Sequence, residues 1–180
     1  MFRRLFAITL FLACTGMAQP AGANDFAGRF ALAEVRKPVP SFIFQDGQGR
    51  ETDLKAFRGR YVLLNLWATW CAPCVREMPA LDALQARFGK QRLSVIALTQ
   101  DRDGLAVAKG FFNRYDIKNL GVYADGAGRA GSILGISGLP TTLLIDPQGR
   151  EIGRVSGNAE WDAPDTIAFL EARMLKVATR

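Results

Sequence analysis

The feature that most constrains this 180-residue chain is the sequence Cys-Ala-Pro-Cys at residues 71–74. It follows a nearly continuous apolar run at residues 61–67 and opens a helical pattern over residues 73–88. Such a run is typical of a central strand that is buried on both faces. Because the free N–H groups and the dipole at a helix start stabilise an anion, a cysteine placed there can be a reactive thiolate.

The spacing of the two cysteines predicts a reversible disulfide in which each has its own role. Pro73 falls in the first helical turn, where its missing N–H costs little. Cys74 lies about one turn beyond Cys71 and faces the same side. We expect Cys71 to be exposed and to attack, and Cys74 to be more shielded and to resolve the mixed disulfide.

Other uses of a cysteine pair find little support in the sequence. Structural zinc needs four ligands, usually Cys or His, but the chain has no histidine and only one further cysteine, Cys14. Haem attachment needs a histidine directly after the second cysteine, where Val75 stands. A purely structural disulfide at this spacing would constrain almost nothing. We therefore expect redox activity that depends on no metal and no other cofactor.

The first 23 residues have the pattern of a secretory signal peptide. A basic start precedes an apolar core at residues 5–13 and small residues at 21–23. Cleavage is expected after Ala23, with Ala18 as the second choice. An uncleaved membrane anchor or a lipid on Cys14 are the alternatives, although the apolar core is shorter than the roughly 20 residues of a membrane span. We expect a periplasmic protein, or one attached to the inner membrane in either of these ways.

Residues 24–40 are expected to be a leader and residues 41–180 one domain. Helical spacing is expected in the leader at 27–37, and Pro79 is expected to kink the helix after the cysteines. The expected strands lie at residues 42–44, 61–67, 93–98, 120–123, 141–145 and 151–155. The expected helices lie at residues 53–57, 73–88, 104–115, 127–134 and 163–175. This order predicts an α/β fold with a mixed central β-sheet flanked by helices.

The charge of the chain excludes one class of partner. The formal net charge is +6, but the basic residues are scattered along the sequence. Nucleic-acid binding proteins usually gather such residues into patches. We expect a monomer that binds no nucleic acid.

Two segments resemble a known family. Residues 65–79, Asn-Leu-Trp-Ala-Thr-Trp-Cys-Ala-Pro-Cys-Val-Arg-Glu-Met-Pro, resemble the active-site segment of the TlpA/ResA-like branch of thioredoxin-fold thiol–disulfide oxidoreductases. Residues 138–142, Gly-Leu-Pro-Thr-Thr, resemble the cis-proline loop of that family. The resemblance covers residues 42–175, and residues 79–84 are most similar to TlpA. It implies a thioredoxin-like fold with a β/α insertion in the middle.

The resemblance also implies how a substrate would bind. Pro140 is then cis and lies beside the cysteine pair, whereas the plain alternative is a trans proline that opens a strand. The backbone of Leu139 is then free to pair with an extended substrate segment. Trp70, Ala72 and Pro73 complete the expected substrate-binding surface. Trp70 either shields the thiol or packs in the core, and shielding is the expectation.

One position departs from thioredoxin. Asn65 stands where thioredoxin has a buried acid under the cysteine pair, and an amide cannot take a proton from Cys74. In ResA-like proteins a glutamate at the position of Glu77 belongs to the active site. Glu77 either relays a proton to or from Cys74 or merely complements the helix dipole. Trp161 either lies near the site or caps the last helix, and Trp67 is expected in the core.

The function expected from the resemblance is the reduction of disulfides in specific client proteins. The clients would be a copper-site assembly protein or apocytochrome c, and a membrane thiol transporter would supply electrons. A disulfide-forming oxidant is the first alternative. A copper chaperone would use a wider cysteine pair and a histidine. A peroxiredoxin needs a Pro-x-x-x-Thr-x-x-Cys frame, in which Leu64 and Ala68 replace the proline and the threonine.

Overall fold

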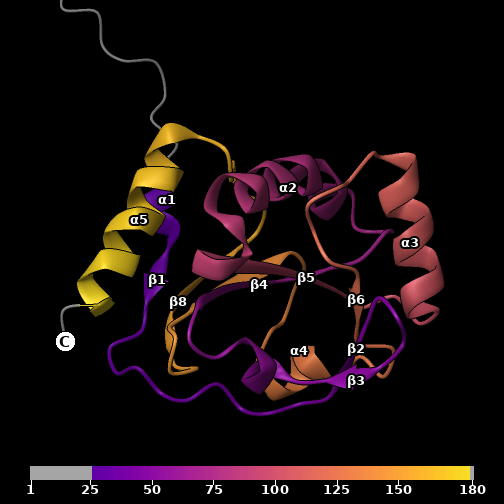
Figure 1. The fold of residues 1–180 in the computed structure, drawn as a ribbon, viewed down its shortest axis with the longest axis horizontal. Coiled ribbons are helices and arrows are strands. Elements are labelled where there is room, and N and C mark those ends of the chain that lie inside the picture. Colours follow the sequence, from indigo (N-terminus) through magenta and orange to yellow (C-terminus); the bar gives the residue numbers. More distant parts are fainter. Residues whose placement is uncertain (1–25, 179–180) are drawn as a thin grey trace, which may run out of the picture.

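An eight-stranded mixed sheet forms the centre of the protein (Figure 1). The structure is a computed structural model that describes residues 26–178. The strands are β1 (Ala31–Leu32), β2 (Phe44–Asp46), β3 (Glu51–Thr52), β4 (Tyr61–Trp67), β5 (Leu93–Thr99), β6 (Tyr123–Ala124), β7 (Thr141–Ile145) and β8 (Glu151–Ser156). The helices are α1 (Phe26–Arg29), the 3₁₀ turn η1 (Leu54–Phe57), α2 (Ala72–Arg92), α3 (Gly104–Arg114), α4 (Arg129–Ile133) and α5 (Pro164–Ala178). The strands follow the order β1-β8-β7-β4-β5-β6-β2-β3.

The register of the three central strands gathers distant residues at one edge of the sheet. All seven residues of β4 are buried, as expected from the apolar run. β4 runs parallel to β5, from Tyr61 opposite Leu93 to Trp67 opposite Thr99, and antiparallel to β7. The carboxyl ends of β4 and β5 therefore meet the amino end of β7. The segments after Trp67, after Thr99 and before Thr141 consequently lie together.

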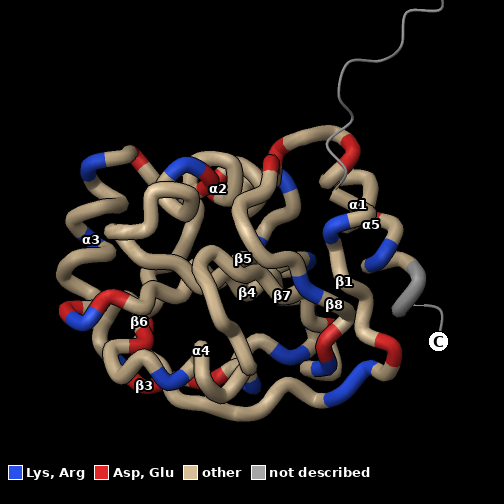
Figure 2. The backbone as a smooth tube through the Cα atoms, turned by 180° about the vertical axis from the view of Figure 1, so that it is seen from behind, with Lys and Arg blue, Asp and Glu red and all other residues tan. Residues whose placement is uncertain are grey.

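Alternation along β4 divides the apolar side chains between two cores. Leu63 and Trp67 pack with residues of α1, α2, α3 and α5 on one face. Leu64 and Leu66 pack with α4 and with the neighbouring strands on the other face. Asn65 shares the α2 face with Leu63 and Trp67, so its polar amide lies fully buried beneath α2. Figure 2 shows that charged residues lie mainly on the outer segments, with both signs interspersed.

Two hairpins are closed by the same local sequence, Asp-x-Gln-Gly-Arg, at residues 46–50 and 146–150. In each, a carboxylate oxygen of the Asp accepts the N–H groups two and four residues later. The glycines, Gly49 and Gly149, have φ values of 78° and 77°. Only glycine takes this left-handed conformation without strain. The turn sequences thus fix both hairpins, although the short strand β3 that closes the first of them was not expected.

The expectation of a helix at residues 27–37 is wrong. The helix α1 ends at Arg29, and Ala31 and Leu32 form the edge strand β1, which pairs with β8. Gly153 permits this pairing, because a Cβ atom there would lie 2.4 Å from the carbonyl oxygen of Ala31. Phe26 adds ring contacts with α5. The partner strand lies more than a hundred residues away, so local spacing carries no signal for it.

Several other boundaries differ from the predictions by a few residues. The strand expected at 42–44 is β2 (Phe44–Asp46), and the strand expected at 120–123 is β6 (Tyr123–Ala124). Within α2, helical backbone angles are interrupted at Gly89, whose φ is 65°, rather than at Pro79. The expected signal peptide at residues 1–23 lies outside the described residues. Within residues 26–178, no helix combines the length and the apolar character needed to cross a membrane.

α3 and β6 form the β/α insertion, and a carboxylate of α2 anchors the loop between them. Asp82 Oδ1 accepts the backbone N–H groups of Lys118, Asn119 and Leu120 at 2.7–3.1 Å, and Oδ2 accepts the Asn119 amide at 2.8 Å. Burial alone would raise the pKa of Asp82, but these hydrogen bonds outweigh it and lower the pKa. The ionised carboxylate therefore holds the insertion against α2.

Replacing Asp82 by alanine should destabilise the fold, because three backbone N–H groups lose their shared acceptor. We expect the free energy of unfolding to fall by about 1–3 kcal/mol, measured by urea denaturation at pH 7. The matched control is Lys118→Ala, which removes only an exposed ion pair with Asp116 and should leave the free energy of unfolding nearly unchanged. Equal losses in the two variants would contradict the anchoring role of Asp82.

Candidate functional site

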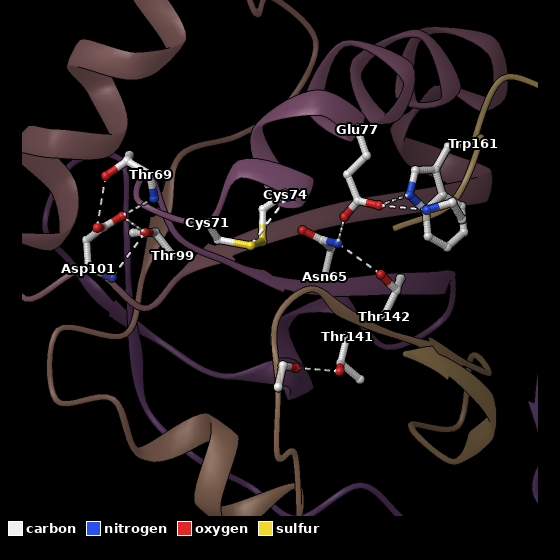
Figure 3. Close-up of a disulfide and its surroundings, with 12 residues drawn as sticks. Asn65, Thr69, Cys71, Cys74, Glu77, Thr99, Asp101, Thr141, Thr142 and Trp161 are labelled. Carbon is white, nitrogen blue, oxygen red and sulfur yellow. Dashed lines mark hydrogen bonds between the residues drawn. A yellow bond between two sulfur atoms is a disulfide. The ribbon is translucent and has the colours of Figure 1, made fainter. Parts of the chain in front are cut away.

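The Cys71–Cys74 disulfide lies at the start of α2, after the short loop that follows β4 (Figure 3). Their Cα atoms are 5.3 Å apart. Cys71 is the N-cap residue of α2, and its sulfur accepts the backbone N–H of Cys74 at 3.3 Å. The cap satisfies one of the free N–H groups at the helix start. The sulfur of Cys71 thus occupies the place where a helix N-terminus favours negative charge.

A buried carboxylate from the neighbouring strand fixes the loop that leads to Cys71. Asp101 follows β5, and its oxygens accept the Thr69 N–H at 2.9 Å, the Thr69 hydroxyl at 3.0 Å and the Thr99 hydroxyl at 2.6 Å. The Gln100 N–H adds a bond to the Trp67 carbonyl. Sequence reasoning missed Asp101. The one available signal was an acid two residues after a parallel strand, a common place for functional groups in α/β proteins.

Glu77 lies on the other side of the disulfide and joins three segments of the chain (Figure 3). Its Oε1 accepts Asn65 Nδ2 at 2.7 Å, and its Oε2 accepts Trp161 Nε1 and the Ala159 N–H, each at 3.0 Å. Only 3% of Glu77 is exposed. A side chain that merely complemented the helix dipole would remain in solvent, so that reading of Glu77 does not fit its burial. Trp161 lies at the site rather than at a helix cap.

The environment of Glu77 favours its protonated form. Burial raises the pKa of this carboxyl above its ordinary value of 4.5, and the three hydrogen bonds oppose the rise only in part. Perturbed carboxyl groups next to reactive side chains are frequent at functional sites. Glu77 is therefore suited to exchange a proton at a higher pH than a solvated carboxyl does.

The proline loop borders a groove beside the cysteine pair. The peptide bond between Leu139 and Pro140 is cis, as the resemblance implied, and Pro140 is buried at the amino end of β7. Trp70 is 72% exposed, which excludes core packing. A groove of about 420 Å³ is lined by Leu66, Trp70, Gln100, Gly131, Ile136, Ser137, Gly138 and Leu139. Trp70 and Leu139, two of the expected substrate-binding residues, thus share one groove.

The remaining predicted residues lie close by but are placed differently. Ala72 is exposed and Pro73 half-buried in the first turn of α2, and neither lines that groove. Cys71 is only 6% exposed in the disulfide form, so the expectation that it is exposed is wrong for this state. Cys74 is completely buried, so the expected order of accessibility holds. Trp67 is fully buried in the core.

Comparison with known families agrees with this geometry. The family model for Redoxin matches residues 34–168. The chain belongs to the Redoxin family. Two relatives of this chain are thiol-disulfide oxidoreductases named ResA. The one from Bacillus cereus is 34% identical and the one from Bacillus subtilis is 32% identical. The first alignment covers 86% of this chain and 88% of the relative, and the second 86% of each.

Solved structures show the same fold. A Chlorobium tepidum protein assigned as the thiol:disulfide interchange protein DsbE is 26% identical, with a TM-score of 0.65 over 78% of this chain and 95% of that one. A DsbF homologue from Corynebacterium diphtheriae reaches a TM-score of 0.66 over 92% of this chain and 99% of that one. Its identity is 20%, which supports the fold alone. With its disulfide and its ResA relatives, this Redoxin is a thiol–disulfide oxidoreductase of thioredoxin-like fold.

The described part of the chain offers no site for a metal ion. Among residues 26–175, no three Cys, Asp, Glu or His side chains are grouped closely enough to hold one.

The raised pKa of Glu77 gives stability a definite dependence on pH. Between pH 4.5 and the raised value, the folded protein binds more protons than the unfolded chain, so stability falls as the pH rises through this window. Glu77→Gln cannot titrate, and its thermal midpoint should lose this part of the decline. The control Glu34→Gln, at an exposed position, should keep the wild-type slope. An unchanged slope in Glu77→Gln would show that Glu77 does not titrate in this window.

Proposed function

We propose that this protein is a periplasmic reductase that transfers electrons from its reduced cysteine pair to disulfides of specific client proteins. The observation that carries the proposal is the Cys71–Cys74 disulfide at the N-terminus of α2, next to the groove formed with the cis-proline loop. A redox pair at this position has a stabilised thiolate and an adjacent surface for a polypeptide.

The proposed reaction has two exchange steps. The thiolate of Cys71 attacks one sulfur of the client disulfide, and the other client sulfur leaves with the electron pair and takes up a proton. Cys74 then loses its proton and attacks the Cys71 sulfur of the mixed disulfide. The client sulfur that was bound to Cys71 leaves with the electron pair and takes up a proton. The client is then a dithiol, reduced by two electrons, and the Cys71–Cys74 bond is restored. Cys71 suits the first role because it is the more accessible sulfur and caps the helix.

Glu77 is the proposed acceptor for the proton that Cys74 releases. It lies three residues after Cys74 and therefore on the same side of α2. Its buried carboxyl with a raised pKa can take up the proton without direct access to bulk water. The return of the proton to the solvent completes the cycle. Of the two roles considered for Glu77, proton relay is therefore the one proposed.

The groove suits an extended client segment with an apolar side chain near its cysteine. Trp70 presents a largely exposed ring, and Leu139, which is partly buried, also lines the groove. Because Pro140 has no N–H, the backbone of Leu139 supplies the polar groups that would pair with the client. Ala72 and Pro73, at the start of α2, would contact the client beside the reacting sulfurs.

Reduction rather than oxidation is proposed on the strength of the resemblance to TlpA and ResA. The signal-peptide pattern at residues 1–23 supports a place outside the cytoplasm, through release into the periplasm or through attachment to the inner membrane. A reductase there needs a membrane thiol transporter as electron donor. A copper-site assembly protein or apocytochrome c is the proposed client, and a monomer is the proposed state.

A Cys74→Ser variant tests the order of attack. It keeps the nucleophile but cannot resolve the mixed disulfide, so clients should accumulate as covalent adducts on Cys71. Turnover with insulin and dithiothreitol should be lost. The matched variant Cys71→Ser should form no such adducts, and mass spectrometry of the adducts checks both results. Adducts that form through Cys74 in the Cys71→Ser variant would reverse the assigned roles.

The reduction potential separates the reductase from the alternative oxidant. Equilibration with glutathione should give a value well below that of strong oxidants such as DsbA, about −120 mV. A potential near −120 mV would replace the reductase by a disulfide-forming oxidant and leave the exchange chemistry intact.

Glu77→Gln should slow the resolving step by about 10²-fold at pH 7, because the proton of Cys74 loses its acceptor. In the wild type, the rate should rise as the pH passes through the raised pKa of Glu77, since only the ionised carboxyl accepts a proton. The variant should lack this rise. Stopped-flow tryptophan fluorescence between pH 4 and 9 measures both, and superimposable profiles would rule out the relay.

A further inference from the structure

The amide of Asn65 contains a buried acceptor atom that the oxidised protein leaves without a partner. Asn65 is fully buried, and its Oδ1 atom has no hydrogen-bond donor. Buried polar atoms are nearly always paired, because an unpaired one destabilises the fold. The unpaired oxygen therefore needs an explanation in the function of the site.

The orientation of this amide is set by its other end. Asn65 Nδ2 donates to Glu77 Oε1 at 2.7 Å and to the Thr142 hydroxyl at 2.9 Å. Glu77 Oε2 already accepts two N–H groups, from Trp161 and Ala159, so the carboxylate faces donors on both oxygens. These bonds hold Nδ2 toward Glu77 and direct Oδ1 the opposite way.

The Oδ1 atom of Asn65 is directed toward the disulfide. In Figure 3 the oxygen of Asn65 points toward the sulfurs, from the strand below α2. Cys74 and Glu77 are three residues apart on α2, so their side chains are neighbours on one helix face. The Asn65 amide lies below that face, and its nitrogen donates to Glu77. Its oxygen therefore lies on the side of Cys74.

We propose that Asn65 Oδ1 accepts a hydrogen bond from the S–H group of Cys74 in the reduced protein. Cys74 has no proton to donate while it is part of the disulfide, which accounts for the unpaired oxygen in the oxidised form. An external dithiol reduces the bond in two steps. Its first thiolate attacks Cys71, and its second sulfur, after losing its proton, displaces Cys71 as a thiolate and closes the external disulfide. Cys74, which leaves in the first step with the electron pair, takes up one proton. That proton is then shared with Asn65.

The consequence is a division of charge between the two cysteines. An S–H···O bond stabilises the thiol form of Cys74, whereas the α2 N–H groups stabilise the thiolate form of Cys71. Asn65 is thus a positioning residue that keeps the resolving cysteine protonated until a mixed disulfide forms. It also favours the reduced protein over the oxidised one. This inference rests on the proposed redox cycle and adds to it the residue that sets the state of Cys74.

The S–H stretching band of Cys74 tests the bond directly. In a Cys14→Ser/Cys71→Ser background, Cys74 is the only thiol of the chain. Its infrared band should lie at lower wavenumber in the folded protein than in the same protein unfolded in urea. Adding Asn65→Leu, which removes the acceptor at similar volume, should return the band to the position of a free thiol. Adding Thr142→Val removes a partner of Nδ2 but leaves Oδ1, and should leave the band where it was.

The redox equilibrium supplies a second readout in the complete protein. Loss of one such bond of about 1 kcal/mol should shift the equilibrium of Asn65→Leu about fivefold toward the disulfide. For a two-electron couple this is about 20 mV more negative. Thr142→Val should shift it by less than twofold.

The outcomes distinguish this inference from the proposed function. A folded-state band at the free-thiol position in the background protein would overturn the role of Asn65, even if Asn65→Leu fails to fold. Insulin reduction by the wild-type protein would still support the reductase in that case. Conversely, a shifted band that Asn65→Leu abolishes would support the hydrogen bond even if the wild-type protein reduces no client.

Discussion

The buried carboxylate of Glu77 is the constraint on which the rest of the site depends. A charged or polar group removed from water must be matched by hydrogen-bond donors. Glu77 finds them on β4, at Ala159 and on the ring of Trp161. It thereby ties the centre of the sheet to the segment before α5. Trp161 in turn packs edge-on against Phe26 at 5.4 Å, so α1 contacts the tryptophan that donates to Glu77.

Two buried carboxylates flank the disulfide, and they differ in the groups that they bind. Asp101 holds the backbone and hydroxyl of Thr69, and so fixes the loop that presents Cys71. Glu77 makes no bond to that loop and lies on the side of Cys74. Asp101 therefore fixes the geometry of the loop, and Glu77 is the group for which a proton-accepting role is proposed. Asn65 donates to Glu77 and points its oxygen toward the sulfurs, so a neutral amide on β4 faces the disulfide.

Local patterns were sufficient to predict the central strands and the start of α2. The apolar run of β4, the Pro after Cys71 and the Asp-x-Gln-Gly-Arg turns each determine structure through neighbours in sequence. The hydrogen bonds from Asp101 to Thr69 and from Trp161 to Glu77 were not predictable in this way, because their partners are 32 and 84 residues apart. The edge strand β1 was missed for the same reason. It exists because Gly153 leaves space for a crossing backbone.

The pairing of β1 with β8 has a consequence for how molecules of this protein meet one another. β8 would otherwise offer its free backbone groups to any extended chain, including another copy. The two residues of β1 cover part of that border, and the adjoining Phe26 and Phe30 bury their rings beneath it. A recombinant version that began at residue 41 would expose this border and the apolar surface beside it. Such a truncation would promote aggregation, so the short N-terminal segment protects the protein against it.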